Sequence, residues 1–303
     1  MVVGGYTGIP SGEIINEVEI LDPFINNTNA ILPPFPDYRV NAVGQLYNQK
    51  PLICGGKDKD AYKDDCYEYY NNTWTKSDVS LNEVRRGASS VVVKENIIWV
   101  SGGVGDDRSP LSSTDLIHSN DPDFLKAVDL PRNMSSHCSA TFNETYVFIA
   151  GNFQDGAENG AYLVNTMSEP YAFTQLPNMS YGHYGAACGT IKHHNETKLV
   201  VAGGGIFDPP NSLSLSSVEL YSFTTGEWEE GPVLPRGFQY GSSLYYPNPD
   251  TKSLDLILIG GLDGNLNGQR NIMWYNEAEA EFKILDLELK TERSEFCAFL
   301  IEM

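Results

Sequence analysis

Val201-Ala202-Gly203-Gly204 is a short apolar run that ends in a pair of glycines, and copies of this pattern recur along the whole 303-residue chain. Six copies can be read, of which the fourth keeps only its first glycine: Val3-Gly4-Gly5, Ile53-Cys54-Gly55-Gly56, Val100-Ser101-Gly102-Gly103, Ile149-Ala150-Gly151-Asn152, the stretch just quoted, and Ile259-Gly260-Gly261. The first glycines of successive copies are 51, 47, 49, 52 and 57 residues apart. A fixed period of about fifty residues predicts an array of one repeated unit.

Each unit holds short strand-like segments separated by turn residues. In the clearest copy these segments cover 240–246, 256–261, 271–275 and 282–285, with clusters of Gly, Asn, Asp and Pro between most of them. Short runs rich in β-branched and aromatic residues, bounded by such clusters, are typical of antiparallel hairpins. No stretch shows the sustained periodicity of an amphipathic helix. The sequence therefore predicts an all-β protein with four strands per repeat.

Aromatic residues recur at fixed distances after the glycines. Tyr221 is followed seven residues later by Trp228, and Tyr275 is followed seven residues later by Phe282. A glycine pair that closes a strand, followed by a tyrosine and then a tryptophan, resembles the kelch repeat, and this resemblance covers nearly the whole chain. It implies a six-bladed β-propeller made of four-stranded antiparallel blades, because one blade cannot bury both of its faces alone.

The resemblance also implies one domain over residues 1–303 and a particular way of closing the ring. Met1-Val2-Val3-Gly4-Gly5 matches the second strand of a blade, and 293–301 matches the first strand that this blade lacks. We therefore expect the carboxy-terminal strand to complete the first blade. The expected blades are 1–38 plus 293–303, 39–85, 86–131, 132–180, 181–235 and 236–292.

Composition limits the partners. The 20 basic and 40 acidic residues give a formal net charge of −20, which repels the phosphates of nucleic acids and anionic membrane surfaces. No apolar run reaches the length of about eighteen residues that a membrane span needs. We expect a monomeric ring with a protein partner, with no nucleic acid, no membrane span and no cofactor.

Cysteines and sequons bear on the cellular compartment. Cys54 ends one strand and Cys66 begins the next, so we expect a disulfide between them, with Cys138, Cys188 and Cys297 as unpaired core residues. Asn-x-Ser/Thr sequons, all in predicted turns, occur at Asn26, Asn71, Asn133, Asn143, Asn178 and Asn195. Together these features favour a secreted or extracellular glycoprotein whose signal peptide is not in this sequence. A cytoplasmic protein is the alternative.

In kelch-type blades, the loops between the second and third strands and the linkers between blades emerge on one face, here called the long-loop face. The tight hairpin turns emerge on the other, here called the turn face. We expect long loops at 6–16, 57–65, 105–113, 153–160, 206–216 and 262–270. Binding residues commonly lie on loops that a rigid scaffold holds, so the long-loop face is the predicted protein-binding surface. Glycans at Asn26, Asn71, Asn143 and Asn195 would shield the turn face, while Asn133 and Asn178 would lie at the rim of the long-loop face.

Arginines and aromatic residues, which are common anchors of protein interfaces, gather at this rim. The predicted partner-binding residues are Tyr38, Arg39, Tyr62, Arg86, Arg108, Arg132, Tyr181, His183, Arg236 and Phe238. An arginine at the start of a blade also recurs in kelch units as a structural residue, so packing is the alternative role for each of those. Arg108 lies in a loop within a blade and is not subject to that alternative.

Catalytic and metal chemistry find little support. The chain has no Gly-x-Ser-x-Gly, Walker, Rossmann or His-Glu-x-x-His pattern. The segment 57–65 carries alternating carboxylates but lacks the glycine and the final glutamate of an EF-hand loop, and His193 and His194 point apart on an extended chain. We expect no catalytic residue and no metal site. Two alternatives stay open: a carbohydrate-active or metal-dependent enzyme on a propeller scaffold, and the substrate receptor of a ubiquitin-ligase adaptor.

Overall fold

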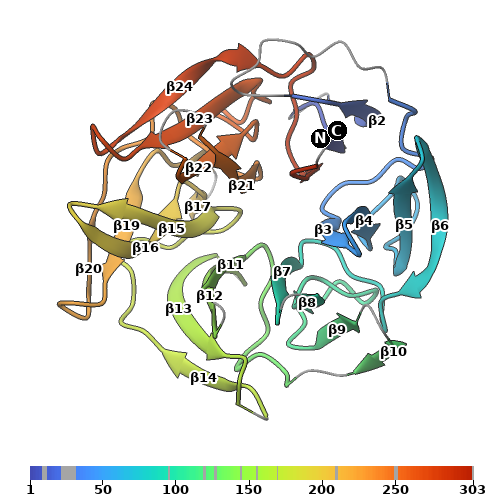
Figure 1. The fold of residues 1–303 in the computed structure, drawn as a ribbon, viewed down its shortest axis with the longest axis horizontal. Helices are drawn as coiled ribbons and strands as arrows, with labels where there is room; N and C mark the ends of the chain where they lie inside the picture. The colour runs from blue at the N-terminus through green and yellow to red at the C-terminus, as the bar shows by residue number, and fades with distance from the viewer. Residues whose placement is uncertain are drawn as a thin grey trace.

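The computed structural model describes residues 1–8, 12–21, 32–94, 96–118, 121–125, 128–143, 145–154, 156–168, 170–208, 211–248 and 252–301. Its sheets surround a central axis as the six blades of a propeller (Figure 1). Every strand pair is antiparallel, and the described residues contain no helix. The predicted fold class is confirmed.

Five blades have four strands each, with the first strand of each blade nearest the axis (Figure 1). Blade 2 consists of β3 (Val43–Tyr47), β4 (Lys50–Cys54), β5 (Asp65–Tyr70) and β6 (Thr73–Ser80), and blade 3 of β7 (Ser89–Val93), β8 (Ile97–Ser101), β9 (Thr114–His118) and β10 (Asp121–Leu125). Blade 4 consists of β11 (Cys138–Phe142), β12 (Tyr146–Phe153), β13 (Ala157–Asn165) and β14 (Ala172–Gln175). Blade 5 consists of β15 (Ala187–His193), β16 (Glu196–Ala202), β19 (Val218–Ser222) and β20 (Glu227–Glu230), and blade 6 of β21 (Ser242–Pro247), β22 (Leu254–Ile259), β23 (Asn271–Asn276) and β24 (Glu281–Glu288).

Blade 1 joins the two ends of the chain. β1 (Val2–Tyr6) pairs with β2 (Ile14–Glu19) on one side and with β25 (Cys297–Ala298) on the other. The backbone nitrogen of Met1 donates a hydrogen bond of 2.8 Å to the carbonyl of Phe299. The carboxy-terminal segment therefore supplies the innermost strand of blade 1, as the repeat register predicts.

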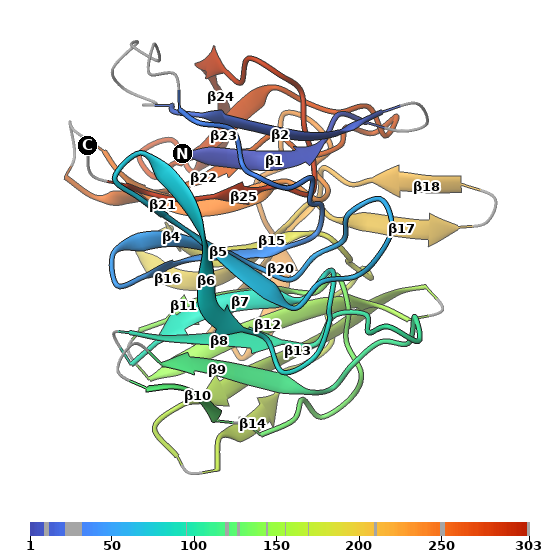
Figure 2. The same ribbon diagram turned by 90° about the vertical axis from the view of Figure 1, so that its right-hand side faces the viewer.

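Two of the predicted long loops are wrong in form. The segment after Gly204 folds into a separate hairpin of β17 (Gly205–Asp208) and β18 (Asn211–Ser214), which projects from the ring (Figure 2). The predicted loop 153–160 is mostly strand, because β12 and β13 continue pairing as far as Phe153 opposite Ala157. The ring of Phe153 packs 4.8 Å from that of Tyr184, which ties this extension to blade 5.

The glycine pairs give space to the linker that enters the next blade. Gly203 and Gly204 have φ angles of 67° and 90°, which side chains rarely permit. A Cβ atom on Gly203 would lie 2.3 Å from the carbonyl oxygen of Phe238, which crosses this strand end. The Gly204 N–H donates to that same carbonyl at 2.6 Å. The pair therefore seats each linker against the preceding blade, which explains why the motif has the period of the blades.

Aromatic side chains fill the wedges between blades. Trp74 of blade 2 packs edge-on against Phe35, with ring centroids 5.0 Å apart, and Trp228 of blade 5 lies 6.0 Å from Phe148 of blade 4. Phe35 and Phe148 are fully buried. Such contacts hold neighbouring blades together through apolar burial.

Candidate binding face

A closed circle of backbone hydrogen bonds surrounds the axis where the linkers enter the inner strands. Each N–H of the circle donates to the carbonyl of the member before it, with N···O distances from 2.6 to 3.1 Å, and Asn41 closes the circle by donating to Glu295. Every member has a φ angle between 52° and 64°. The six members are Asn41, Gly87, Ser136, Gly185, Tyr240 and Glu295, one from each blade linker. The circle fixes the linkers relative to one another and makes the long-loop face a rigid platform.

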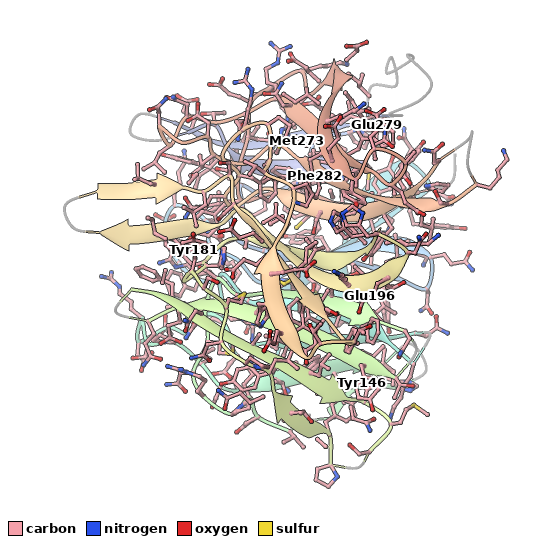
Figure 3. All side chains as sticks on the ribbon, turned by 90° about the vertical axis from the view of Figure 1, so that its left-hand side faces the viewer. Tyr146, Tyr181, Glu196, Met273, Glu279 and Phe282 are labelled. Carbon is pink, nitrogen blue, oxygen red and sulfur yellow. A yellow bond between two sulfur atoms is a disulfide. The ribbon has the colours of Figure 1, made fainter. Side chains whose placement is uncertain are left out.

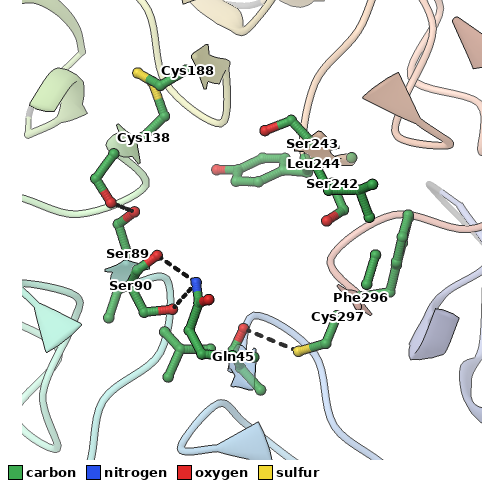
Figure 4. A pocket seen from close by; sticks show the side chains of 18 of the residues that line it. Gln45, Ser89, Ser90, Cys138, Cys188, Ser242, Ser243, Leu244, Phe296 and Cys297 are labelled. Atoms are coloured by element: carbon green, nitrogen blue, oxygen red, sulfur yellow. Dashed lines mark hydrogen bonds between the residues drawn. A yellow bond between two sulfur atoms is a disulfide. The ribbon is translucent and has the colours of Figure 1, made fainter. Parts of the chain in front are cut away.

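The inner strands enclose a central channel of about 480 Å³ whose lining mixes apolar and uncharged polar residues (Figure 4). The amide nitrogen of Gln45 donates to the carbonyl and the hydroxyl of Ser90 at 2.8 and 3.2 Å, and Ser89 contacts Ser139. Among the described lining residues the only acid is Glu295. Burial raises the pKa of this carboxyl, although Asn41, Arg86 and Lys57 oppose the shift.

The channel wall carries a disulfide that the sequence analysis did not predict. Cys138 of β11 and Cys188 of β15 are bonded, with Cα atoms 5.4 Å apart (Figure 4). The prediction that both are free is wrong, because the inner strands of adjacent blades converge at the axis and bring residues 50 positions apart into contact. The predicted Cys54–Cys66 disulfide is present across the β4–β5 pair. Cys297 is free, and burial raises its pKa to about 12.

Arg39 is a structural residue and not a surface contact. It is 3% exposed, and its Nη1 donates to the carbonyls of Gly55 and Asp65 at 3.2 and 2.9 Å beneath the glycine pair of blade 2. Its Nη2 also pairs with the carboxylate of Asp65. Burial of the Asp65 carboxyl acts to raise its pKa, but the Arg39 guanidinium outweighs this effect and holds the pKa below its usual value.

Arg85 and Arg293 occupy the same position in blades 3 and 1. Arg85 donates to the carbonyls of Gly102 and Ser113, and Arg293 donates to those of Gly4 and Glu17. The prediction that blade 3 starts at Arg86 is wrong by one residue, because Arg85 occupies this buried position. The adjacent Arg86 points elsewhere.

His183 and Phe238, which the sequence analysis placed in the binding surface, fill the corresponding positions of blades 5 and 6. Both are fully buried. Nδ1 of His183 lies 2.6 Å from the carbonyl oxygen of Gly203, and Nε2 lies 2.9 Å from the carboxylate of Glu219. Like Arg39, they hold a linker in place and offer no side chain to a partner.

The other predicted residues reach the surface. Tyr38 and Tyr181 are each 45% exposed. Arg108, Arg132 and Arg236 are exposed, while Tyr62 and Arg86 are half-buried. Arg132 pairs with Glu158 at 2.6 Å. Figure 3 places Tyr181 on the side from which β17 and β18 project, and places Tyr146, Glu196 and Glu279 on the opposite side.

Tyr62, Arg86 and Arg108 come together in one groove between blades 2 and 3. The guanidinium carbon of Arg86 lies 5.2 Å from the centre of the Tyr62 ring, a cation–π contact. This groove, here called the blade 2–3 groove, has a volume of about 460 Å³. The residues that line it are Lys57, Lys59, Asp60, Ala61, Tyr62, Arg86, Asp106 and Arg108. The alternating Lys and Asp residues of 57–60 were a sequence signal for this lining, in which the lysines contribute as well as the carboxylates.

The sequons that the structure describes all have exposed asparagines. Asn71, Asn143 and Asn195 lie in hairpin turns of blades 2, 4 and 5, with φ angles of 49°, 52° and 66°. Asn133 and Asn178 lie in linkers. Asn26 lies outside the described residues.

Other titratable groups have structural partners. His137 is buried and contacts the hydroxyl of Ser101 at 3.0 Å, and burial lowers its pKa to about 4. His193 contacts the hydroxyl of Tyr275 at 2.8 Å. Within the described ranges, no group of three or more His, Cys, Asp or Glu side chains is placed to hold a metal ion.

Comparison with known proteins agrees with the fold. The family profile described as the Kelch motif matches residues 193–234, in blade 5. No curated protein matches the chain. A solved structure titled "Structure of YjhT" superposes with a TM-score of 0.77 at 15% sequence identity, covering 94% of this chain and 97% of that one. At this identity the likeness shows the fold alone.

Proposed function

Because the chain is a kelch-repeat β-propeller, we propose that it is a protein-interaction module that binds its partner through the long-loop face. The observation that carries the proposal is the blade 2–3 groove, where Tyr62, Arg86 and Arg108 lie together on a rigid frame. Tyrosine and arginine are the residue types that contribute most to protein interfaces. Tyr38 and Tyr181, which are both exposed, are the other aromatic residues proposed for this surface.

The backbone circle supports the proposal through preorganisation. Loops that are already held in their binding conformation lose little conformational entropy when a partner docks. The blade 2–3 groove borders this circle, since Arg86 and Lys57 act electrostatically on Glu295. On the turn face, the exposed sequon asparagines Asn71, Asn143 and Asn195 lie in separate hairpin turns. The groove between blades 5 and 6 contains Lys192, which already pairs with Glu277.

We further propose that the protein is a secreted or extracellular glycoprotein. Two disulfides favour an oxidising compartment, and glycans on the turn face would leave the long-loop face for the partner. No helix among the described residues is long and apolar enough to cross a membrane. Peptide-N-glycosidase treatment of the protein from its native source tests this proposal: a mass loss at Asn71, Asn143 or Asn195 supports it, and unmodified sequons would contradict it.

The alternatives have weaker support. An adaptor of a ubiquitin ligase works in the reducing cytosol, where two structural disulfides are not expected. A glycoside hydrolase most often uses a pair of carboxylic acids at its reaction site. The described lining of the channel contains one acid, Glu295. Binding is therefore the function that the geometry supports best.

Affinity capture of the partner followed by calorimetry tests the proposed function. Tyr62→Ala or Arg108→Ala should weaken binding by about 1–2 kcal/mol and leave the fold intact. The matched changes on the turn face, Asn143→Ala and His194→Ala, should leave the affinity unchanged. Equal losses from both faces would contradict the assignment of the binding surface.

A further inference from the structure

The blade 2–3 groove concentrates positive charge in a strongly acidic protein. The chain carries a formal charge of −20, whereas this groove holds four cationic side chains and two acidic ones. In the part of the chain that the structure describes, no carboxylate forms an ion pair with Lys57, Lys59, Arg86 or Arg108. The nearby Asp58 is already bound by Lys63. Arg86 and Lys57 also attract the buried carboxyl of Glu295, but no ion pair within the described residues holds the cations of the groove, so they are available to a ligand.

Arg86 is the clearest sign of an unmet partner. The adjacent Arg85 donates to two carbonyls and pairs with two carboxylates. Nε is buried without a hydrogen-bond partner in both arginines, but Arg86 differs because its terminal nitrogens donate no hydrogen bond to the described residues either, and its guanidinium lies over the Tyr62 ring. An arginine carries five donors in a rigid fork, so a half-buried guanidinium with none of them used is prepared for an acceptor from outside.

We infer that the blade 2–3 groove binds an acidic segment of the partner protein, whose side-chain carboxylates pair with Arg86 and Arg108. This inference rests on the proposed function and specifies the chemistry of the partner. A carboxylate matches the guanidinium fork with two parallel hydrogen bonds. The Tyr62 ring holds the Arg86 guanidinium in place for such a pair.

The lining of the groove favours a protein segment over a small molecule. Pockets for small molecules are predominantly apolar, whereas six of the eight residues in this lining are charged. A long polyanion would meet the acidic surface beyond the groove and be repelled. Asp60 and Asp106 limit how many carboxylates the groove accepts, because each opposes a like charge placed beside it. A short acidic segment satisfies these conditions.

A labelled hexaglutamate peptide tests the inference by fluorescence anisotropy, with hexaglutamine and hexalysine peptides as references. The double variant Arg86→Gln/Arg108→Gln should lower the affinity for hexaglutamate by about tenfold or more. The control Arg132→Gln/Arg236→Gln removes the same charge from the same face and should change the affinity by less than about twofold. Arg86→Lys keeps the charge but loses the fork, so it should fall between wild type and Arg86→Gln.

Three results would overturn the inference. Equal losses from both double variants would mean a diffuse electrostatic attraction. Displacement of the peptide by inorganic phosphate where acetate has no effect would assign the site to phosphate. If the protein self-associates in sedimentation experiments and Arg86→Gln abolishes this self-association, the groove binds a second copy of the chain.

The captured partner separates this inference from the proposed function. The partner could bind Arg86→Gln/Arg108→Gln as tightly as wild type but fail to bind Tyr38→Ala/Tyr181→Ala. In that case the inference of an acidic segment is wrong, whereas the proposed binding face is supported. If none of these variants affects the partner, both are wrong. Thermal unfolding of every variant confirms that it is folded.

Discussion

Arg85 and Arg86 are neighbours in the sequence with opposite roles, and replacing each by methionine separates them. Arg85 is 1% exposed and donates to the carbonyls of Gly102 and Ser113 at 2.7 and 3.0 Å. It also lies 3.1 Å from the carboxylate of Asp115, itself buried. Burial raises the pKa of Asp115, an effect that Arg85 opposes.

Removing the Arg85 guanidinium leaves the buried Asp115 carboxylate without its countercharge and takes one donor from each of two carbonyls. Breaking a buried ion pair on one side costs about 3–5 kcal/mol, so Arg85→Met should lower the free energy of unfolding by this amount. Arg86→Met removes a side chain that contacts the Tyr62 ring and acts on Glu295 only through a longer-range attraction, so its loss should be about 0.5–1 kcal/mol. Equilibrium denaturation in urea at neutral pH measures both.

A second substitution tests the cause. Arg85→Met/Asp115→Asn removes the uncompensated charge and should recover part of the loss, which a double-mutant cycle quantifies. Equal destabilisation by Arg85→Met and Arg86→Met would refute the structural role of Arg85. If the double variant lost more unfolding free energy than the two single variants lose together, the buried ion pair would be refuted as the cause.

Three further predictions concern the ring. Replacing both Cys138 and Cys188 by serine should lower the free energy of unfolding by about 4 kcal/mol on the loop-entropy model. The same change at Cys54 and Cys66 should lower it by about 3 kcal/mol, because that disulfide closes a shorter loop. Urea denaturation measures both losses, and a larger loss for Cys54–Cys66 would contradict the prediction. Deleting residues from Arg293 onward should expose the inner edge of β1 and lower the unfolding temperature of the whole ring, whereas an unchanged temperature would contradict closure. Burial raises the pKa of Glu295 in the folded state, so the stability associated with its protonated form is present below the unfolded pKa and is lost as the pH rises through the folded pKa. In denaturation curves measured over a pH series, Glu295→Gln should remove this loss of stability. Parallel pH dependences for wild type and variant would contradict the prediction.

The repeat pattern was sufficient to predict the fold. The spacing of the glycine pairs predicts six blades, and the register of the two chain ends predicts the pairing of β1 with β25. The Cys54–Cys66 disulfide was predictable for the same reason, since both residues flank a loop of one blade. These features depend on distances within a repeat, which the sequence contains directly.

Contacts between blades were harder to predict. The Cys138–Cys188 disulfide joins two repeats and depends on how closely inner strands approach at the axis. The choice between Arg85 and Arg86 depends on a single residue of register, which decides whether a side chain is buried or faces the groove. The backbone circle involves main-chain groups of six linkers, and no side-chain pattern indicates it.

The residues of the blade 2–3 groove were predicted in part. Tyr62, Arg86 and Arg108 were each selected as surface anchors, but their convergence needs the positions of two loops from different blades. Arg39, His183 and Phe238 were selected with them, although they serve to hold linkers in place. An arginine or aromatic residue in a blade linker can either contact a partner or hold the linker in place, and its burial distinguishes the two roles.

Hydrogen exchange of the protein, alone and with its captured partner, tests the central claim most directly, because it reports which backbone segments the partner covers. We expect slower exchange at residues 57–62 and 105–111, on the long-loop face between blades 2 and 3. It predicts no change in the hairpin turns at Asn71, Asn143 and Asn195. Protection confined to those turns would contradict the claim that the long-loop face binds the partner.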